Sequence, residues 1–317
     1  MKKILVLDTS IVSKNTGDSI IMDAVYSELK EIFHSDMFFN SITHDRIWRT
    51  TYSLNRISDF TLVGGTNLLS SNMNSYNQWK INMFDSLFLK GIILMGVGWH
   101  VNPHRPNMYT EFLLKKVLNR QYLHSVRDSQ AESLLRSIGI SNVLNTGCMT
   151  MWRLTNEHCS KIPKSKADSV VFTLTDYSKD YVKDQMLIDI LIKKYEKVYF
   201  WPQGNGDLDY LAVLKNTQNI VILGANLWSF DVLICDHSKN LEYIGTRLHA
   251  GIRALQKARR SLIIGIDNRA QAMAADFNLN VLSRNDLSNL NKIISNDIIT
   301  EIRLNEDNIL TWKRQFQ

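Results

Sequence analysis

What this 317-residue sequence lacks already narrows the class of protein. Its three cysteines, Cys148, Cys159 and Cys235, form no Cys-x-x-Cys pair and have no histidines at metal-ligand spacing, which argues against a disulfide framework and a structural zinc site. No apolar run approaches the roughly 18 residues that a membrane helix needs. The best run, residues 91–99, is broken by glycines, so the sequence does not predict a membrane-spanning protein.

Signals for targeting, repeats and metal chemistry are also missing. The first residues imitate a signal peptide, but Asp8 interrupts the apolar stretch and no small-residue cleavage site follows, so we expect the first strand of a cytoplasmic protein. Neither an internal repeat nor a low-complexity tract is present. Because no His-Glu-x-x-His motif and no Asp-x-Asp motif directly at a strand end stands out, we expect no bound metal.

The charge is only modestly one-sided. Lysine and arginine number 37 against 31 acidic residues, a formal net charge of +6 that suits binding to phosphorylated metabolites, anionic lipid surfaces or nucleic acid. No known nucleic-acid module accompanies the excess, so we do not expect nucleic acid as a partner. A hydrophobic content of 44% with 21% charged residues is typical of a globular protein, and the length fits two domains.

Apolar runs in the first half alternate with helical patterns. Residues 3–7 are typical of a buried parallel strand, and apolar residues from Ile20 to Ile32 recur at helical spacing. Further strands are predicted at 59–63, 91–95 and 122–128. The last is followed by Ser129-Gln130-Ala131-Glu132, a capping-box pattern, and by a helix that ends at Gly139.

A second alternating series follows a polar stretch at residues 153–168. Strands are predicted near 169–174, 197–201, 219–223, 241–244 and 261–266, with helices at 180–195, 207–216, 229–239 and 249–259 and helical character over 285–316. Such alternation favours parallel sheets with right-handed crossovers. We therefore expect an α/β fold of two Rossmann-like parallel-sheet domains facing a cleft, residues 1–160 and 165–317, with the terminal helices in the second.

Several short motifs lie where strands are predicted to end. They are Asn15-Thr16-Gly17-Asp18, Gly64-Gly65, Gly96-Val97-Gly98, Ser125-Val126-Arg127-Asp128 and Arg247-Leu248-His249-Ala250. Paired glycines let the backbone approach a ligand or turn sharply. The Gly-x-Gly pair lacks the third glycine of a dinucleotide fingerprint, so no Rossmann cofactor is expected. An arginine and an imidazole two positions apart at a strand-to-helix turn suit anion binding and proton transfer.

Taken in order, these motifs resemble the polysaccharide pyruvyl transferase family over residues 15 to about 270. The resemblance implies a two-domain GT-B architecture and a transferase that places the pyruvyl group of phosphoenolpyruvate as a cyclic ketal on two hydroxyls of a sugar, with no further cofactor. The acceptor would belong to a capsule or exopolysaccharide or to its lipid-linked precursor. The chain departs from the family at Thr66, where a third glycine is usual, at Cys148-Met149, where Asp-Pro is usual, and at Arg269, which replaces a lysine.

The chemistry assigns hypothetical roles to these residues. Phosphoenolpyruvate carries a carboxylate and a phosphate, which arginine recognises best, so Arg127, Arg247 and Arg269 are its candidate ligands. His249 is the candidate acid for the enol carbon, and Asp18, expected across the cleft from it, would take a hydroxyl proton or hold the acceptor. Further candidate contacts are Asn15, Gly17, Gly64, Gly65 and Gly98.

Other interpretations stay open at this point. Each residue has a plain structural alternative: a helix cap for Asp18, a pairing with Asp128 for Arg127, a surface salt bridge for Arg247, a helix-end role for His249 and a surface position for Arg269. A GT-B glycosyltransferase that uses a nucleotide sugar, or a non-catalytic carbohydrate-binding relative, also fits. If the acceptor is lipid-linked, the basic surface suits peripheral work next to the anionic inner membrane leaflet.

Overall fold

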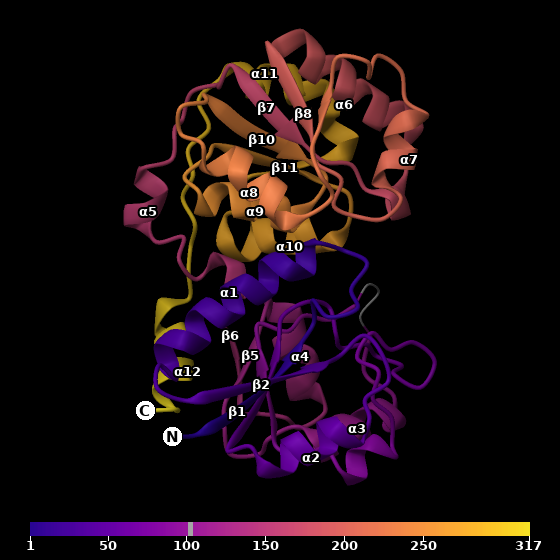
Figure 1. Ribbon diagram of the computed structural model, residues 1–317, viewed down its shortest axis with the longest axis vertical. Helices are drawn as coiled ribbons and strands as arrows, with labels where there is room; N and C mark the ends of the chain where they lie inside the picture. Colours follow the sequence, from indigo (N-terminus) through magenta and orange to yellow (C-terminus); the bar gives the residue numbers. More distant parts are fainter. Residues whose placement is uncertain (101–103) are drawn as a thin grey trace. The chain divides into compact units, whose positions relative to one another are not determined.

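The computed structural model describes residues 1–100 and 104–317, apart from the side chains of Asn268 and Arg269 (Figure 1). The chain divides into two units. Unit 1 comprises Met1–Ser13, Ile21–Trp152 and Leu304–Gln317, and unit 2 comprises Lys14–Ile20 and Arg153–Arg303. Each unit is an α/β layer structure with its own parallel sheet, as the alternation of apolar runs predicts.

Unit 1 contains a four-stranded parallel sheet in the order β2-β1-β3-β4 and a two-stranded parallel pair, β5 and β6. The strands are β1 (Lys3–Asp8), β2 (Met37–Ile42), β3 (Phe60–Gly64), β4 (Ile92–Met95), β5 (His124–Val126) and β6 (Val143–Asn145). The helices are α1 (Gly17–Ile32), whose first residues fall in unit 2, α2 (Arg49–Ile57), η1 (Asp85–Leu87), α3 (Met108–Val117), α4 (Ser129–Ser137), η2 (Met149–Met151) and α12 (Glu306–Arg314).

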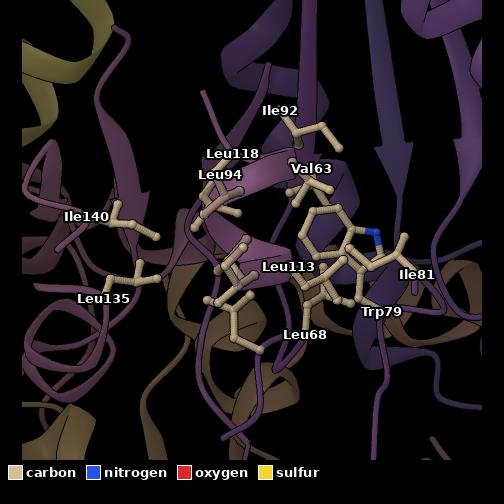
Figure 2. Close-up of a cluster of buried hydrophobic side chains, with 14 of the residues drawn as sticks. Val63, Leu68, Trp79, Ile81, Ile92, Leu94, Leu113, Leu118, Leu135 and Ile140 are labelled. Atoms are coloured by element: carbon tan, nitrogen blue, oxygen red, sulfur yellow. The ribbon is translucent and has the colours of Figure 1, made fainter. Parts of the chain in front are cut away.

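Alternate residues of the buried strands feed two separate apolar clusters, one on each face of this sheet. Leu5 and Leu7 of β1 join the cluster shown in Figure 2, where Trp79, Val63, Leu94 and Leu113 meet. Ile4 and Val6 point the other way, into a cluster completed by α1 and α12. Burial on both faces explains why β1 is a continuous apolar run.

The last helix belongs to unit 1. Ile309, Trp312 and Phe316 pack in the same cluster as Ile4 and Val6 of β1. The expectation that residues 165–317 form one domain with the terminal helices is therefore wrong for Leu304–Gln317. Helical spacing in α12 predicts an apolar face but does not tell against which sheet that face packs.

Unit 2 contains a six-stranded parallel sheet in the order β12-β11-β10-β7-β8-β9. The strands are β7 (Ser169–Phe172), β8 (Lys197–Phe200), β9 (Val221–Ile222), β10 (Leu241–Gly245), β11 (Ser261–Gly265) and β12 (Val281–Ser283). The helices are α5 (Asn156–Ser160), η3 (Asp176–Ser178), α6 (Tyr181–Lys194), α7 (Asp207–Ala212), α8 (Leu227–Cys235), α9 (Leu248–Gln256), α10 (Asn268–Phe277), η4 (Arg284–Asn289) and α11 (Leu290–Ser295).

The strand order reverses between β10 and β7, and this reversal positions the candidate site. Strands β7, β8 and β9 run outward on one side, and β10, β11 and β12 on the other. In open parallel sheets, ligands bind beyond the carboxyl ends of the strands at such a switch point. A ligand of unit 2 is therefore expected next to the segments that follow β7 and β10.

Three local expectations need correction. The helix after β5 is capped by Asp128, whose side chain accepts from Ala131 N over 2.8 Å, so Ser129 is the first helical residue and the capping box is wrong. Strands β2, β6 and β12 and helices α2, α3 and α5 lie outside the predicted elements, and the segment 285–316 is helical only in η4, α11 and α12. Within the described ranges, no helix combines the length and the apolar character needed to cross a bilayer.

Candidate functional site

The candidate site is a small cavity in unit 2, beyond the carboxyl ends of β7 and β10. It has a volume of about 20 Å³, and its lining includes Asn15, Tyr177, Gln203, Arg247, His249 and Asp267. A space of this size holds one water molecule, so a substrate with a phosphate group needs the lining to move. The structure thus brings three predicted residues, Asn15, Arg247 and His249, to one cavity.

Arg247 is the anchor of this cavity. Its backbone N–H donates to Thr173 Oγ1 (3.1 Å), and its Nε donates to the carbonyl of Leu174 (2.9 Å). Its Nη2 donates to Oδ1 of Asp176 (3.0 Å) and to Oδ1 of Asp207 (2.5 Å). The guanidinium is 3% exposed, so these bonds hold it in one orientation. With Nε and Nη2 engaged in the described structure, Nη1 is the donor that remains for a ligand.

Asp207 is the fixed counter-charge of Arg247. Its side chain is fully buried, and its Oδ2 accepts from the backbone N–H groups of Gln203 (3.0 Å) and Gly204 (2.7 Å). Burial raises the pKa of Asp207, and the Arg247 guanidinium and the backbone N–H groups of Gly204 and Asp176 oppose that rise. Asp207 is not among the predicted residues, although its position at the start of α7, after a strand and a glycine-containing loop, is a usable signal.

Asn15 and Gln203 join two loops at the edge of the cavity. Gln203 Nε2 donates to Asn15 Oδ1 over 2.8 Å, and the backbone N–H of Thr16 donates to the Gln203 carbonyl over 3.0 Å. The Gly17 backbone N–H donates to the same Asn15 oxygen over 3.0 Å. A Cβ on Gly17 would lie 2.6 Å from Gln203 Nε2, so a larger residue there would displace the Gln203 amide from Asn15.

Gln203 Oε1 has no hydrogen-bond partner among the described residues, and Gln203 as a whole is 5% exposed. A buried acceptor without a donor is unfavourable, and such groups often face a ligand or water. Gln203 is not among the predicted residues, because a glutamine after an aromatic strand forms no motif by itself.

Asp18 lies in the first turn of α1 and is buried. Its backbone N–H donates to the Asn15 carbonyl over 3.0 Å. The expectation that Asp18 lies on the other domain from His249 is wrong, because Lys14–Ile20 packs with unit 2. The loop that carries Asn15 and Asp18 is held there by its bonds to Gln203.

His249 is the second residue of α9 and is 9% exposed. The strand-to-helix turn predicted for it is confirmed, since β10 ends at Gly245 and α9 begins at Leu248. Arg269 lies in the first turn of α10, and its side chain is outside the described part of the structure. Its neighbours Asp267 and Ala270 line the cavity, so the start of α10 borders it.

Unit 1 carries the other predicted residues. Arg127 follows β5, is 2% exposed, and its Nη2 lies 3.3 Å from Asp128 Oδ2. A Cβ on Gly98 would lie 2.5 Å from Arg127 Cζ and 2.8 Å from Asn67 Oδ1, so Gly98 leaves room for both polar groups. Asn67 Oδ1 is buried with no hydrogen-bond partner in the described ranges. Asn67 is not among the residues predicted from the sequence.

Gly64 and Gly65 are explained by packing on α1. A Cβ on Gly64 would lie 2.8 Å from Met22 Sδ, and one on Gly65 would lie 2.0 Å from Ile21 Cγ2. Gly65 also has a φ of +51°, a region that favours glycine. Neither approach involves a polar group, so these two glycines let β3 end against the helix.

Across the described residues, no group of three or more histidine, cysteine, aspartate or glutamate side chains is placed to hold a metal ion. Cys148 and Cys159 are buried free thiols and Cys235 is an exposed one.

Comparisons with known proteins agree with this architecture. Residues 15–268 match the family model described as polysaccharide pyruvyl transferase. One similar solved structure is MnaA from S. aureus with UDP, which has a TM-score of 0.54 and 12% identity over 94% of this chain and 92% of that chain. Another is UDP-GlcNAc 2-epimerase from Neisseria meningitidis with UDP-GlcNAc, which has a TM-score of 0.52 and 12% identity over 99% of this chain and 100% of that chain. No curated protein matches the sequence. Identities this low show the fold alone, and the predicted GT-B-like α/β fold is confirmed.

Proposed function

Because the chain belongs to the polysaccharide pyruvyl transferase family, we propose that it transfers the pyruvyl group of phosphoenolpyruvate to two hydroxyls of a sugar. The product is a cyclic ketal, and phosphate is released. The observation that carries this proposal is the shared cavity of Arg247, His249 and Asn15 at the switch point of the unit 2 sheet. It combines a fixed cation, an imidazole and a buried polar loop in one place.

The reaction balances with one acid and one base. His249 donates a proton to the methylene carbon of the enol, which becomes the methyl group, and positive charge develops at the adjacent carbon. The first sugar hydroxyl bonds to that carbon, the carbon–oxygen bond to phosphate then breaks, and the second hydroxyl closes the ring. The two hydroxyl protons end on the methyl group and on phosphate. Asp18 accepts a hydroxyl proton and His249 is reprotonated.

Arg247 alone does not carry enough positive charge to bind phosphoenolpyruvate, which is a trianion. Asp176 and Asp207 both accept from its Nη2, so this group of three side chains carries a net negative charge when all are ionised. We therefore propose that Arg247 orients the donor through Nη1, and that Arg269 and the first-turn N–H groups of α10 hold an anionic group. In unit 1, Arg127 is proposed to bind an anionic substrate group through the guanidinium that rests over Gly98.

The decisive experiment supplies phosphoenolpyruvate and a panel of aryl and lipid-linked glycosides, and follows phosphate release together with product mass. We expect phosphate release that depends on one acceptor and a product with the mass of its pyruvate ketal. Sugar binding without phosphate release would contradict the proposal and identify a carbohydrate-binding protein. The structural neighbours bind UDP and UDP-GlcNAc, so a nucleotide sugar is the second candidate donor. Turnover of a nucleotide sugar without any response to phosphoenolpyruvate would identify the protein as a glycosyltransferase and contradict the proposed pyruvyl transfer.

A further inference from the structure

Three neighbouring segments of unit 1 expose large apolar side chains. They are residues 48–57, which include α2, residues 84–90, which include η1, and α3. The docking surface that they form consists of Trp48 (70% exposed), Phe84 (62%), Leu87 (63%), Phe88 (48%), Met108 (88%) and Phe112 (51%). Single exposed apolar residues are ordinary, but six large ones in neighbouring segments are typical of an interaction site.

Direct contacts make these segments one surface. The ring of Tyr52 on α2 stacks on Phe88 with centroids 5.0 Å apart, and its hydroxyl donates to Asp85 Oδ1 over 2.5 Å. Asn55 and Lys90 exchange two hydrogen bonds of 3.1 Å. Helix α3 packs against η1, and Figure 1 shows α2 and α3 in the same part of unit 1. Trp48 is the N-cap residue of α2, and its carbonyl accepts from the backbone N–H of Tyr52 over 3.3 Å.

Helix α3 presents an exposed stripe opposite its buried face. Leu113, Leu114 and Val117 pack in the core, whereas Met108 and Phe112 are exposed at spacing i and i+4. Lys116 continues this stripe one turn further, and its Nζ lies 5.3 Å from the centroid of the Phe112 ring. Apolar side chains next to a lysine that can extend to a polar headgroup are typical of a membrane-interface face.

The charges of this surface select the partner. In the three segments, the exposed charged side chains are Arg49, Arg56, Lys90 and Lys116, all of them cations. The acids are neutralised or hidden: Glu111 pairs with Lys115 over 2.6 Å, and Asp85 is buried beneath Tyr52. A second copy of the chain would bring these cations face to face, which is repulsive. An anionic lipid surface complements both the charge and the apolar side chains.

We propose that this docking surface binds the headgroup region of an anionic lipid bilayer, with Phe84, Leu87 and Met108 entering the boundary between headgroups and acyl chains. The inference does not depend on the donor of the reaction. It holds for any enzyme whose acceptor is presented at a membrane, and it predicts binding in the absence of substrate.

Vesicle co-sedimentation with the full chain tests the proposal. We expect binding to phosphatidylcholine vesicles that contain phosphatidylglycerol, and weaker binding to pure phosphatidylcholine. The double variant Phe84→Ser/Leu87→Ser should lower the partition coefficient at least about tenfold on both vesicles, since each side chain loses its apolar transfer energy. The double variant Arg56→Glu/Lys116→Glu should weaken only the binding to phosphatidylglycerol, as raised salt should. The control Trp228→Ser removes a 74% exposed tryptophan of α8 in unit 2 and should leave binding unchanged.

Several results would overturn the proposal. These are no binding of the unaltered chain to phosphatidylglycerol vesicles, binding by the Phe84→Ser/Leu87→Ser variant at the original strength, or loss of binding in Trp228→Ser. If light scattering shows a dimer of the unaltered chain and a monomer of the Phe84→Ser/Leu87→Ser variant, the surface binds a second copy of the chain and not a membrane. Equal melting temperatures of all variants show that the fold is intact. Phosphate release with a water-soluble glycoside is measured in parallel, so a failure of the proposed chemistry is separate from a failure of docking.

Discussion

The side-chain amide of Gln203 donates a 2.8 Å hydrogen bond to Asn15 Oδ1 across a sequence separation of 188 residues. The Gly17 backbone N–H donates to the same oxygen, which fixes that oxygen as the acceptor and the Gln203 nitrogen as the donor. Gln203 Oε1 then points elsewhere, buried and with no partner in the described structure. One amide therefore holds the first loop of the chain to unit 2 and offers an acceptor to a ligand.

Replacing Gln203 by glutamate tests this bridge with almost no change in shape. The variant Gln203→Glu loses the N–H donor and places a carboxylate against Asn15 Oδ1, so we expect a loss of about 1–3 kcal/mol in unfolding free energy. The KM for the acceptor or donor should also rise. Urea denaturation and steady-state kinetics measure both effects. Gln130→Glu, on the exposed side of α4, is the control, and equal stability of the two variants would contradict the bridge.

Arg247 should be intolerant of lysine. Lysine cannot reach Leu174 O, Asp176 and Asp207 at once, and Asp207 is fully buried, so Arg247→Lys leaves a partly uncompensated charge. We expect a loss of about 3 kcal/mol in stability and at least about a hundredfold loss of turnover. Arg253→Lys, in the helix that begins directly after Arg247, is the control, because Asp231, its partner, is 25% exposed. If thermal unfolding shows the same loss of stability for both variants, the buried bonds of Arg247 are no more stabilising than those of Arg253.

Replacing His249 should lower the rate of phosphate release and leave the fold unchanged. His249→Asn keeps a hydrogen-bonding side chain but removes the acid, so kcat for phosphate release should fall by about 10²–10⁴ while KM changes little. His237→Asn, an exposed histidine after α8, is the control. Phosphate release and circular dichroism measure the two properties. Near-normal turnover in His249→Asn would remove the proposed acid.

Much of this site follows from the sequence because strand ends are visible in it. Arg247 and His249 follow a short, largely apolar strand, Leu241–Gly245, and the carboxyl end of such a strand lies at the ligand edge of a parallel sheet. Asp207 and Gln203 owe their importance to partners 40 and 188 positions away, and no local pattern reports such pairings. Their contribution becomes visible only when the loops meet.

The missed elements of the fold have a similar cause. Strand β2, with the sequence Met-Phe-Phe-Asn-Ser-Ile, lies at the edge of its sheet and is only half-buried, so it lacks the continuous apolar run of β1. Strand β12 is an edge strand with three partly exposed residues. Edge strands carry a weaker pattern because one side faces solvent or loops. The packing of α12 on unit 1 depends on tertiary contacts that its own periodicity does not encode.

Replacing Gly98 should lower activity about as much as replacing Arg127, whose guanidinium lies next to it. A Cβ at this position would lie 2.5 Å from Arg127 Cζ and 2.8 Å from Asn67 Oδ1, and neither buried group can move into solvent without losing its packing. We expect Gly98→Ala to displace Arg127 and to lower kcat/KM about as much as Arg127→Ala does. The double variant should then be little worse than either single variant. Additive losses in a double-mutant cycle would contradict an action of Gly98 through Arg127.

His124 should give unit 1 a defined sensitivity to acid. The ring is fully buried, its Nδ1 accepts from Leu94 N–H over 3.2 Å, and its Nε2 donates to the Asn119 carbonyl over 2.8 Å. Burial lowers the pKa of His124 from its ordinary value of 6.5 to about 4. The unfolded chain therefore binds a proton at higher pH than the folded chain, and stability is complete above pH 6.5 and falls as the pH drops toward 4. The free energy of unfolding should fall by about 3 kcal/mol over this range.

Urea denaturation between pH 7 and 4 measures this fall. The His124→Asn variant should show a smaller change in the free energy of unfolding over the same pH range. An unchanged slope in that variant would assign the acid sensitivity to other groups.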